Sequence, residues 1–140
     1  MNRRLFAQAA ALGLLAPAAF ATLAQAARHR IVIQVSDADA GKWNLALNNA
    51  KNLQDDVGAA NVDIELVVYG PGIGMLKLDA PTNSRVSDAL KAGVKVLACE
   101  NTMRHQKLAR DDMLPGIGYV PAGVTEIMKK QSEGWAYLRP

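Results

Sequence analysis

Cys99 is the only cysteine in the 140 residues, and it is the side chain best suited to covalent chemistry. It ends the apolar segment 94–99, and Asn101 just after it is a typical helix starter. A thiol at a helix start faces free main-chain N–H groups and the positive end of the helix dipole, which both favour the thiolate. Arg104 adds positive charge one turn later, while Glu100 opposes it. An inert, buried thiol is the other interpretation, because free cysteines are often buried.

A second interpretation of the same segment is that it forms a soft-metal site. Cys99, Met103 and His105 are the kinds of ligand that copper accepts, and Cys99 and Met103 could converge across the helix start. No Cys-x-x-Cys motif or methionine-rich repeat accompanies them. We therefore expect no metal and no cofactor, and keep this trio as the alternative. Three further methionines are interpreted as core or interface residues: Met75, Met113 and Met128.

The remaining polar motifs predict no chemistry of their own. Asp111-Asp112 and Lys129-Lys130 are typical of solvent-exposed pairs at a helix end and on a helix face. The loop Gly70-Pro71-Gly72-Ile73-Gly74 lacks the spacing of a dinucleotide fingerprint and the lysine of a phosphate loop. We interpret it as a flexible turn that lets the chain pass close to a neighbouring segment near Cys99.

The elements that position Cys99 alternate between strand and helix. Residues 31–36 are almost all apolar, as in a strand buried on both faces of a parallel sheet. Further strands are expected at 62–69, at 94–99, within 114–120 and at 134–138; helices are expected at 42–57, from Pro81 to Gly93, at 103–109 and at 122–131. Such alternation predicts one α/β domain with a mostly parallel sheet and helices on both faces. In this architecture reactive groups gather at the carboxyl ends of strands, where Cys99 is expected.

The first 26 residues have the pattern of a cleaved signal peptide. A basic start is followed by an apolar run from Ala9 to Leu23 and by the small-x-small site Ala24-Gln25-Ala26. Asn2-Arg3-Arg4-Leu5-Phe6 partly matches the twin-arginine export pattern, although two arginines also suit the general pathway. The apolar run of about fifteen residues is short for a membrane span. We therefore expect a periplasmic protein comprising residues 27–140, with no membrane attachment after cleavage.

Removal of this leader also changes the charge balance. The chain has 16 basic and 13 acidic residues, and loss of Arg3 and Arg4 leaves 14 basic residues against 13. The expected mature domain is therefore nearly neutral, and it shows no basic run interleaved with aromatic residues. Nucleic acid is not an expected partner.

Several motifs together resemble the DsrE/DsrF-like proteins. The segment Val94-Lys95-Val96-Leu97-Ala98-Cys99-Glu100-Asn101-Thr102-Met103 resembles their strand-Cys-x-Asn-[Thr/Ser]-hydrophobic motif. Other matching stretches are Trp43-x-x-Ala46-Leu47-x-Asn49, Val68-Tyr69-Gly70-Pro71-Gly72, Leu114-Pro115-Gly116, residues 120–127 and residues 131–140. The resemblance covers essentially all of residues 27–140.

The resemblance implies a compact subunit with a mostly parallel five-stranded sheet that assembles into trimers or hexamers. In the relay proteins of sulfur oxidation and tRNA thiolation, which are cytoplasmic relatives, a cysteine carries sulfur as a persulfide between partners. The resemblance thus implies that Cys99 carries sulfur between a donor and an acceptor protein, with Asn101 and Arg104 as candidate residues that support Cys99. Such a carrier turns over only with its partners. The alternative is a non-catalytic oligomeric module that binds a small ligand or copper.

Overall fold

A computed structural model describes residues 28–140, and the expected leader lies outside the described residues. Five parallel strands form one sheet, in the order β4-β3-β2-β1-β5. The strands are β1 (His29–Val35), β2 (Val62–Val68), β3 (Lys95–Cys99), β4 (Gly118–Val120) and β5 (Ala136–Leu138). The predicted single α/β domain with a mostly parallel five-stranded sheet is therefore confirmed.

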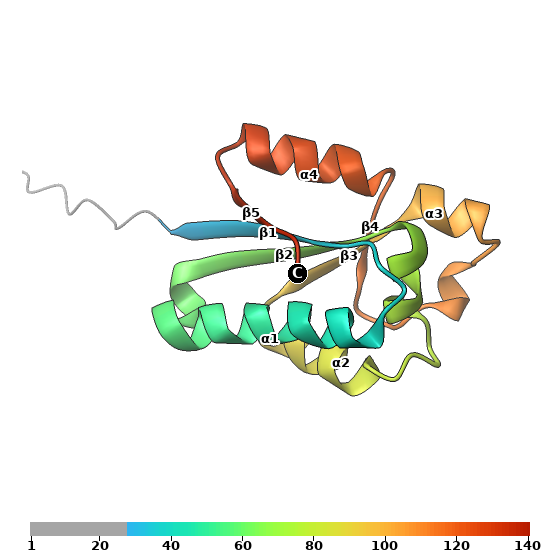
Figure 1. Ribbon diagram of the computed structural model, residues 1–140, viewed down its shortest axis with the longest axis horizontal. Helices are drawn as coiled ribbons and strands as arrows, with labels where there is room; N and C mark the ends of the chain where they lie inside the picture. The colour runs from blue at the N-terminus through green and yellow to red at the C-terminus, as the bar shows by residue number, and fades with distance from the viewer. Residues whose placement is uncertain (1–27) are drawn as a thin grey trace, which may run out of the picture.

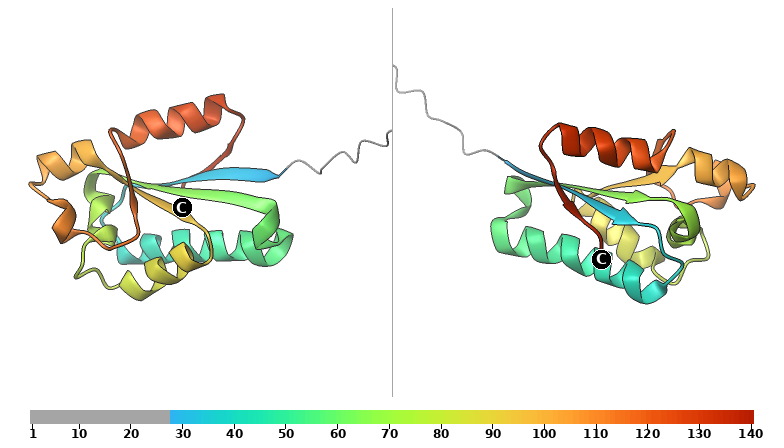
Figure 2. Two further views of the ribbon diagram at one scale, coloured as in Figure 1. Left: turned by 180° about the vertical axis from the view of Figure 1, so that it is seen from behind. Right: turned by 45° about the horizontal axis from the view of Figure 1, so that its top comes forward.

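Helices cover both faces of this sheet, as Figures 1 and 2 show. They are α1 (Ala40–Val57), α2 (Asn83–Lys91), α3 (Glu100–His105) and α4 (Gly123–Ser132), with short 3-10 helices η1 (Ala59–Asn61), η2 (Gly70–Leu76) and η3 (Arg110–Asp112). Helices α1 and α2 lie on one face, α4 lies on the other, and α3 extends from the carboxyl end of β3. Within residues 28–140, none of the helices has the length and apolar character needed to cross a membrane.

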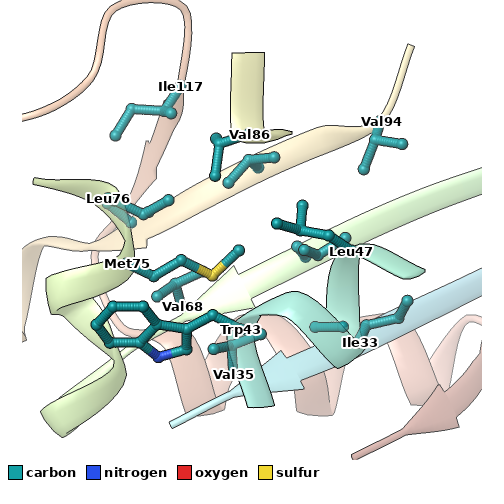
Figure 3. Close-up of a cluster of buried hydrophobic side chains, with 14 of the residues drawn as sticks. Ile33, Val35, Trp43, Leu47, Val68, Met75, Leu76, Val86, Val94 and Ile117 are labelled. Carbon is teal, nitrogen blue, oxygen red and sulfur yellow. The ribbon is translucent and has the colours of Figure 1, made fainter. Parts of the chain in front are cut away.

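Alternation along the strands divides the interior into two unequal layers. Side chains such as Ile33, Leu66 and Val96 point toward α1 and α2 and form the main core, part of which is drawn in Figure 3. The intervening residues, among them Val32 and Val67, point toward α4 and form a smaller cluster with Ile127. Partly buried residues pack against this cluster: Tyr69, Leu97 and Trp135. Because successive strand residues face opposite sides, each strand serves both layers.

The ends of α1 follow from its flanking residues. The Asp39 carboxylate accepts hydrogen bonds from the Gly41 N–H at 2.7 Å and the Lys42 N–H at 3.3 Å, which is an N-cap contributing about 1 kcal/mol. Gly58 ends the helix with a φ of 91°, a backbone region that favours glycine. The indole N–H of Trp43 donates to the Asp37 carbonyl at 2.7 Å and fixes the first turn beneath the sheet edge.

The predicted bounds of two helices are wrong. Helix α2 begins at Asn83 rather than at Pro81, because the Asn83 N–H donates to the Ala80 carbonyl at 3.2 Å and closes a turn that contains Pro81. Helix α3 begins directly after Cys99 and ends at His105, four residues earlier than predicted. Lys107 then adopts a left-handed φ of 56°, which an α-helix cannot continue through.

The glycine-rich segment is the 3-10 helix η2 and not the flexible turn that the sequence predicts. The Gly72 N–H donates to the carbonyls of Ser36 and Tyr69, each at 3.1 Å, so the segment is hydrogen-bonded against the end of β1. A Cβ atom on Gly72 would lie 2.7 Å from the Val35 oxygen. The predicted close approach is therefore real, and its immediate neighbour is β1.

Candidate functional site

Cys99 lies at the carboxyl end of β3, with only 5% of its surface exposed. Its sulfur accepts hydrogen bonds from two main-chain N–H groups, that of Thr102 at 3.5 Å and that of Gly123 at 3.3 Å. Thr102 belongs to α3, and Gly123 is the first residue of α4. Two helix starts therefore converge on one thiol, one of which directly follows Cys99 in the chain.

Opposing effects act on the pKa of the Cys99 thiol. Burial raises the pKa, because it penalises the charged thiolate, whereas hydrogen bonds from the Thr102 side chain and from the N–H groups of Thr102 and Gly123 lower it. The Asn101 N–H contributes least, since it donates to the Pro121 carbonyl at 3.1 Å. The hydrogen bonds outweigh burial, and the pKa lies below its usual value. The site thus stabilises the thiolate relative to that of an ordinary cysteine.

Thr102 connects the thiol to η2. Its Oγ1 accepts a hydrogen bond from the Gly70 N–H at 2.9 Å, which leaves the hydroxyl proton available to the sulfur of Cys99. The Gln106 side chain donates to the Gly70 carbonyl at 3.2 Å from the end of the same helix. The glycine segment therefore supports the thiol through Thr102, without touching the sulfur itself.

Gly123 permits the second N–H group to reach the sulfur. A Cβ atom at this position would lie 3.0 Å from both Cβ and Cδ1 of Tyr69, which is tighter than nearly all real contacts. Tyr69 directly follows β2, so these atoms are close to a fixed backbone and cannot yield easily. Only glycine lets α4 begin this close to the sheet.

A row of polar side chains continues from Tyr69 across the carboxyl edge of the sheet. Burial raises the pKa of the Tyr69 hydroxyl, which is hydrogen-bonded to Ser36. Gln34 donates to Ser36 Oγ at 3.0 Å and accepts from the Tyr137 hydroxyl at 2.5 Å. The row joins β2, β1 and β5, and the cation of Arg139 lies 3.7 Å from Asp37 at the same edge. This polar margin therefore extends from Tyr69, which lies near Cys99, to the ion pair of Arg139 and Asp37 at the far side of the sheet.

The two supporting residues expected from sequence lie on the surface of α3. Arg104 Nη2 donates to Asn101 Oδ1 at 3.2 Å, so the two side chains bind each other. The carboxylate of Glu100 is bound instead by Arg110, at 3.3 Å. Among the described residues, neither the Asn101 nor the Arg104 side chain forms a hydrogen bond with the sulfur of Cys99.

The trio considered for copper is spread over different environments. Met103 is buried in the main core, and His105 is exposed at the end of α3. In the part of the chain that the structure describes, no three His, Cys, Asp or Glu side chains gather as a metal site would need. Met75 and Met113 are buried, as predicted for core residues, whereas Met128 is 59% exposed on α4.

Sequence reasoning missed Gly123 and a charged cluster beneath α4. Lys130, expected on a solvated face, is only 20% exposed and lies 3.8 Å from the carboxylate of Glu65, a buried residue of β2. The signal for Glu65 is a charged residue in the middle of an apolar, centrally placed strand, where acids are rare. Gly123 could have been found because it lies between the strand at 118–120 and the next helix, at the carboxyl edge of the sheet where the site was expected.

Comparisons with known proteins point to one family. A model described as the DsrE/DsrF-like family matches residues 29–140. No curated protein matches the chain. A solved protein of unknown function, MTH1491 from Methanobacterium thermoautotrophicum, is 37% identical, with a TM-score of 0.76, over 80% of this chain and 99% of that one.

Two more distant solved structures share the fold. The ychN protein from E. coli is 17% identical with a TM-score of 0.66, over 80% of this chain and 99% of its own. The conserved protein of unknown function BT1422 from Bacteroides thetaiotaomicron is 15% identical with a TM-score of 0.62, over 79% of this chain and 94% of its own. At these identities the likeness concerns the fold alone.

Proposed function

Because the chain belongs to the DsrE/DsrF-like family, whose fold is of the sulfur-relay type, we propose that it is a sulfur carrier that holds a persulfide on Cys99. The observation that carries this proposal is the pair of N–H groups, from α3 and α4, that bind the Cys99 sulfur. Hydrogen bonds to a thiolate stabilise its charge, and the thiolate is the nucleophilic form of cysteine.

The proposed transfer is an exchange at sulfur that needs no external oxidant. The Cys99 thiolate attacks the outer sulfur of a donor persulfide, and a new S–S bond forms while the donor's own S–S bond breaks. The bonding electrons leave with the donor thiolate, which takes up a proton. An acceptor thiolate then attacks the outer sulfur on Cys99 and regenerates the Cys99 thiolate.

The burial of Cys99 bears on which donors can react. Cys99 is only 5% exposed, and its sulfur lies between the starts of α3 and α4 at the carboxyl end of β3, so we infer that a reagent reaches it from that edge. A cysteine persulfide projecting from a partner protein has the required slender shape. We therefore assign the donor and the acceptor to proteins, with Tyr69 as the member of the polar margin that lies near Cys99.

Cellular location and assembly complete the proposal. The leader predicted at residues 1–26 would place the carrier in the periplasm. The family resemblance implies a trimer or hexamer, and Val124 and Met128, exposed apolar neighbours one turn apart on α4, suit a subunit contact. Size-exclusion chromatography with light scattering gives the subunit number directly.

The experiment is mass spectrometry of the mature protein after incubation with a persulfide donor. The proposal expects the wild type to gain one sulfur atom on Cys99 and to lose it to added thiol, while Cys99→Ser gains none. A glutathione control establishes that the donor was active. A wild-type protein that stays unmodified beside a modified control contradicts the proposal.

The low exposure of Cys99 favours a second candidate, a non-catalytic binding module in which this thiol is structural. Alkylation separates the two functions, because an inert thiol reacts only at the rate of unfolding whereas a carrier thiol reacts in the folded protein. The copper version of this module requires Met103 to leave the hydrophobic core. Copper titration of the wild type against Met103→Ala tests that requirement.

A further inference from the structure

Glu65 is a carboxyl group buried in the middle of the sheet. Its side chain is 3% exposed, and it points toward α4 from β2, between residues that point toward the main core. Val32 of β1 and Lys95 of β3 are its partners in register on the two neighbouring strands. A buried acid at a central strand position is costly unless other groups compensate it.

The compensating charge on α4 is that of Lys130, which Glu65 shares with two other carboxylates. Lys130 Nζ lies 3.8 Å from Glu65 Oε2, 3.7 Å from Glu126 Oε1 and 3.8 Å from Glu133 Oε2. The same ammonium lies 4.7 Å from the centre of the Trp135 ring. One cation, itself only 20% exposed, therefore faces two largely buried carboxylates and the more exposed carboxylate of Glu133.

The neighbouring strands add two further cations. Lys95 lies on β3 beside Glu65, and Arg30 of β1 lies over the Trp135 ring at 5.7 Å. Arg30 also donates to the Glu133 carbonyl at 3.0 Å. The charged groups that act on Glu65 are thus Glu126 and Lys130 of α4 and Lys95 of β3, while Glu133 and Arg30 lie at the edge of the cluster, near Lys130 and Trp135.

A shared proton would allow the carboxyl groups of Glu65 and Glu126 to lie close together. Two ionised carboxylates cannot hydrogen-bond each other, and Oε1 of Glu65 is buried with no partner among the described residues. Burial and the hydrogen bond and charge of Glu126 raise the pKa of Glu65 to about 7, against the lowering influence of Lys130 and Lys95. Protonated Glu65 can donate to the Glu126 carboxylate, which the ionised form cannot do.

The contact between Glu65 and Glu126 lies one helical turn from Gly123, whose N–H is the second hydrogen-bond donor to the Cys99 sulfur. Glu126 follows Gly123 by three residues, and its N–H donates to the Ala122 carbonyl at 3.1 Å in the first turn of α4. Gly123 N–H in turn donates to the sulfur of Cys99. A ten-residue helix moves largely as a unit, so a shift at Glu126 displaces Gly123.

We propose that Glu65 is a positioning residue for Cys99: its protonated carboxyl holds Glu126, and thereby α4, in the place where the Gly123 N–H reaches the sulfur. Ionisation of Glu65 adds repulsion toward Glu126, loosens the start of α4 and weakens that hydrogen bond. The thiolate is then better stabilised when Glu65 carries its proton. This inference rests on the proposed use of Cys99 as a nucleophile, and is independent of its sulfur cargo.

Amide hydrogen exchange at Gly123 tests the proposal in the full-length protein. In the wild type, the protection factor of the Gly123 amide should fall about tenfold between pH 6 and pH 8, the loss expected when one hydrogen bond opens. In Glu65→Gln, whose amide can donate to Glu126 at every pH, the protection factor should stay constant. Glu133→Gln is the matched control, because Glu133 also contacts Lys130 but is largely exposed, and it should behave like the wild type.

Glu126→Gln provides a second route should Glu65→Gln not fold. The new amide can donate to an ionised Glu65, so the fall in Gly123 protection should also disappear in this variant. A wild type without the fall, or a fall that persists in the Gln variants, overturns the proposal. Neither readout involves sulfur transfer, so persulfide loading of Cys99 is a separate result and its failure leaves this test intact.

Discussion

The buried carboxyl of Glu65 should make the stability of this protein depend on pH in a way that one substitution removes. Its pKa rises from 4.5 to about 7 on folding. At 1.36 kcal/mol for each unit, this costs the folded state about 3 kcal/mol once the group is ionised. The side chain is 3% exposed, so solvent screening reduces this figure little.

The sign follows from proton counting. Between pH 4.5 and 7 the folded protein keeps a proton on Glu65 that the unfolded chain has lost, so the free energy of unfolding decreases as the pH rises. Below pH 4.5 both states are protonated, and above pH 7 both are ionised. The full 3 kcal/mol is therefore lost across this window, and the protein is least penalised on the acid side.

Urea denaturation of the wild type and Glu65→Gln from pH 4.5 to 8 measures the effect. The variant should gain about 3 kcal/mol relative to the wild type across the window, which is roughly a 2 M change in the difference between their midpoints. Taking the difference cancels the groups that titrate equally in both proteins. Glu133→Gln should show no such trend. A difference between wild type and Glu65→Gln that does not change with pH refutes the assignment of a buried, protonated Glu65.

Three further outcomes test the site and the leader. Gly123→Ala should lower the free energy of unfolding by about 1–3 kcal/mol in urea denaturation, because the new methyl group forces α4 away from Tyr69. It should also slow alkylation of Cys99, because the N–H of residue 123 moves away from the sulfur with α4. Unchanged stability contradicts the close packing. Thr102→Val should raise the pKa of the Cys99 thiol by about one unit, read from thiolate absorbance, whereas Arg104→Ala should leave it unchanged since Arg104 binds Asn101; equal effects contradict this division. N-terminal sequencing of protein from a periplasmic extract should begin at Ala27, and a chain retaining residues 1–26 contradicts the leader.

The fold follows from patterns that local sequence carries. Continuous apolar residues in β1, a capping aspartate before α1 and a glycine after it each act within a few positions, so the strand and the long helix were predictable to within about two residues. Position 99 was also predictable, because the end of a parallel strand and the start of a helix are adjacent in the chain. These signals do not depend on how distant segments meet.

The rest of the site depends on distant segments. Gly123 reaches Cys99 from 24 residues away, and only the packing of α4 against Tyr69 shows why glycine is needed there. Lys130 resembled a surface residue because its acidic partner, Glu65, lies on another element. Conversely, Arg104 is close to Cys99 in sequence, but the helix directs its side chain to Asn101.

The position of β5 has a consequence for how the chain reaches its folded state. β5 is the last strand in the sequence, and it pairs with the first, Ile31 of β1 lying opposite Ala136. Until the final residues are available, one side of β1 is an unpaired, apolar strand edge of the kind that promotes aggregation. This long-range pairing also slows folding. β1 thus keeps this edge open until β5 pairs with it, and β5 then becomes the edge strand on this side of the sheet.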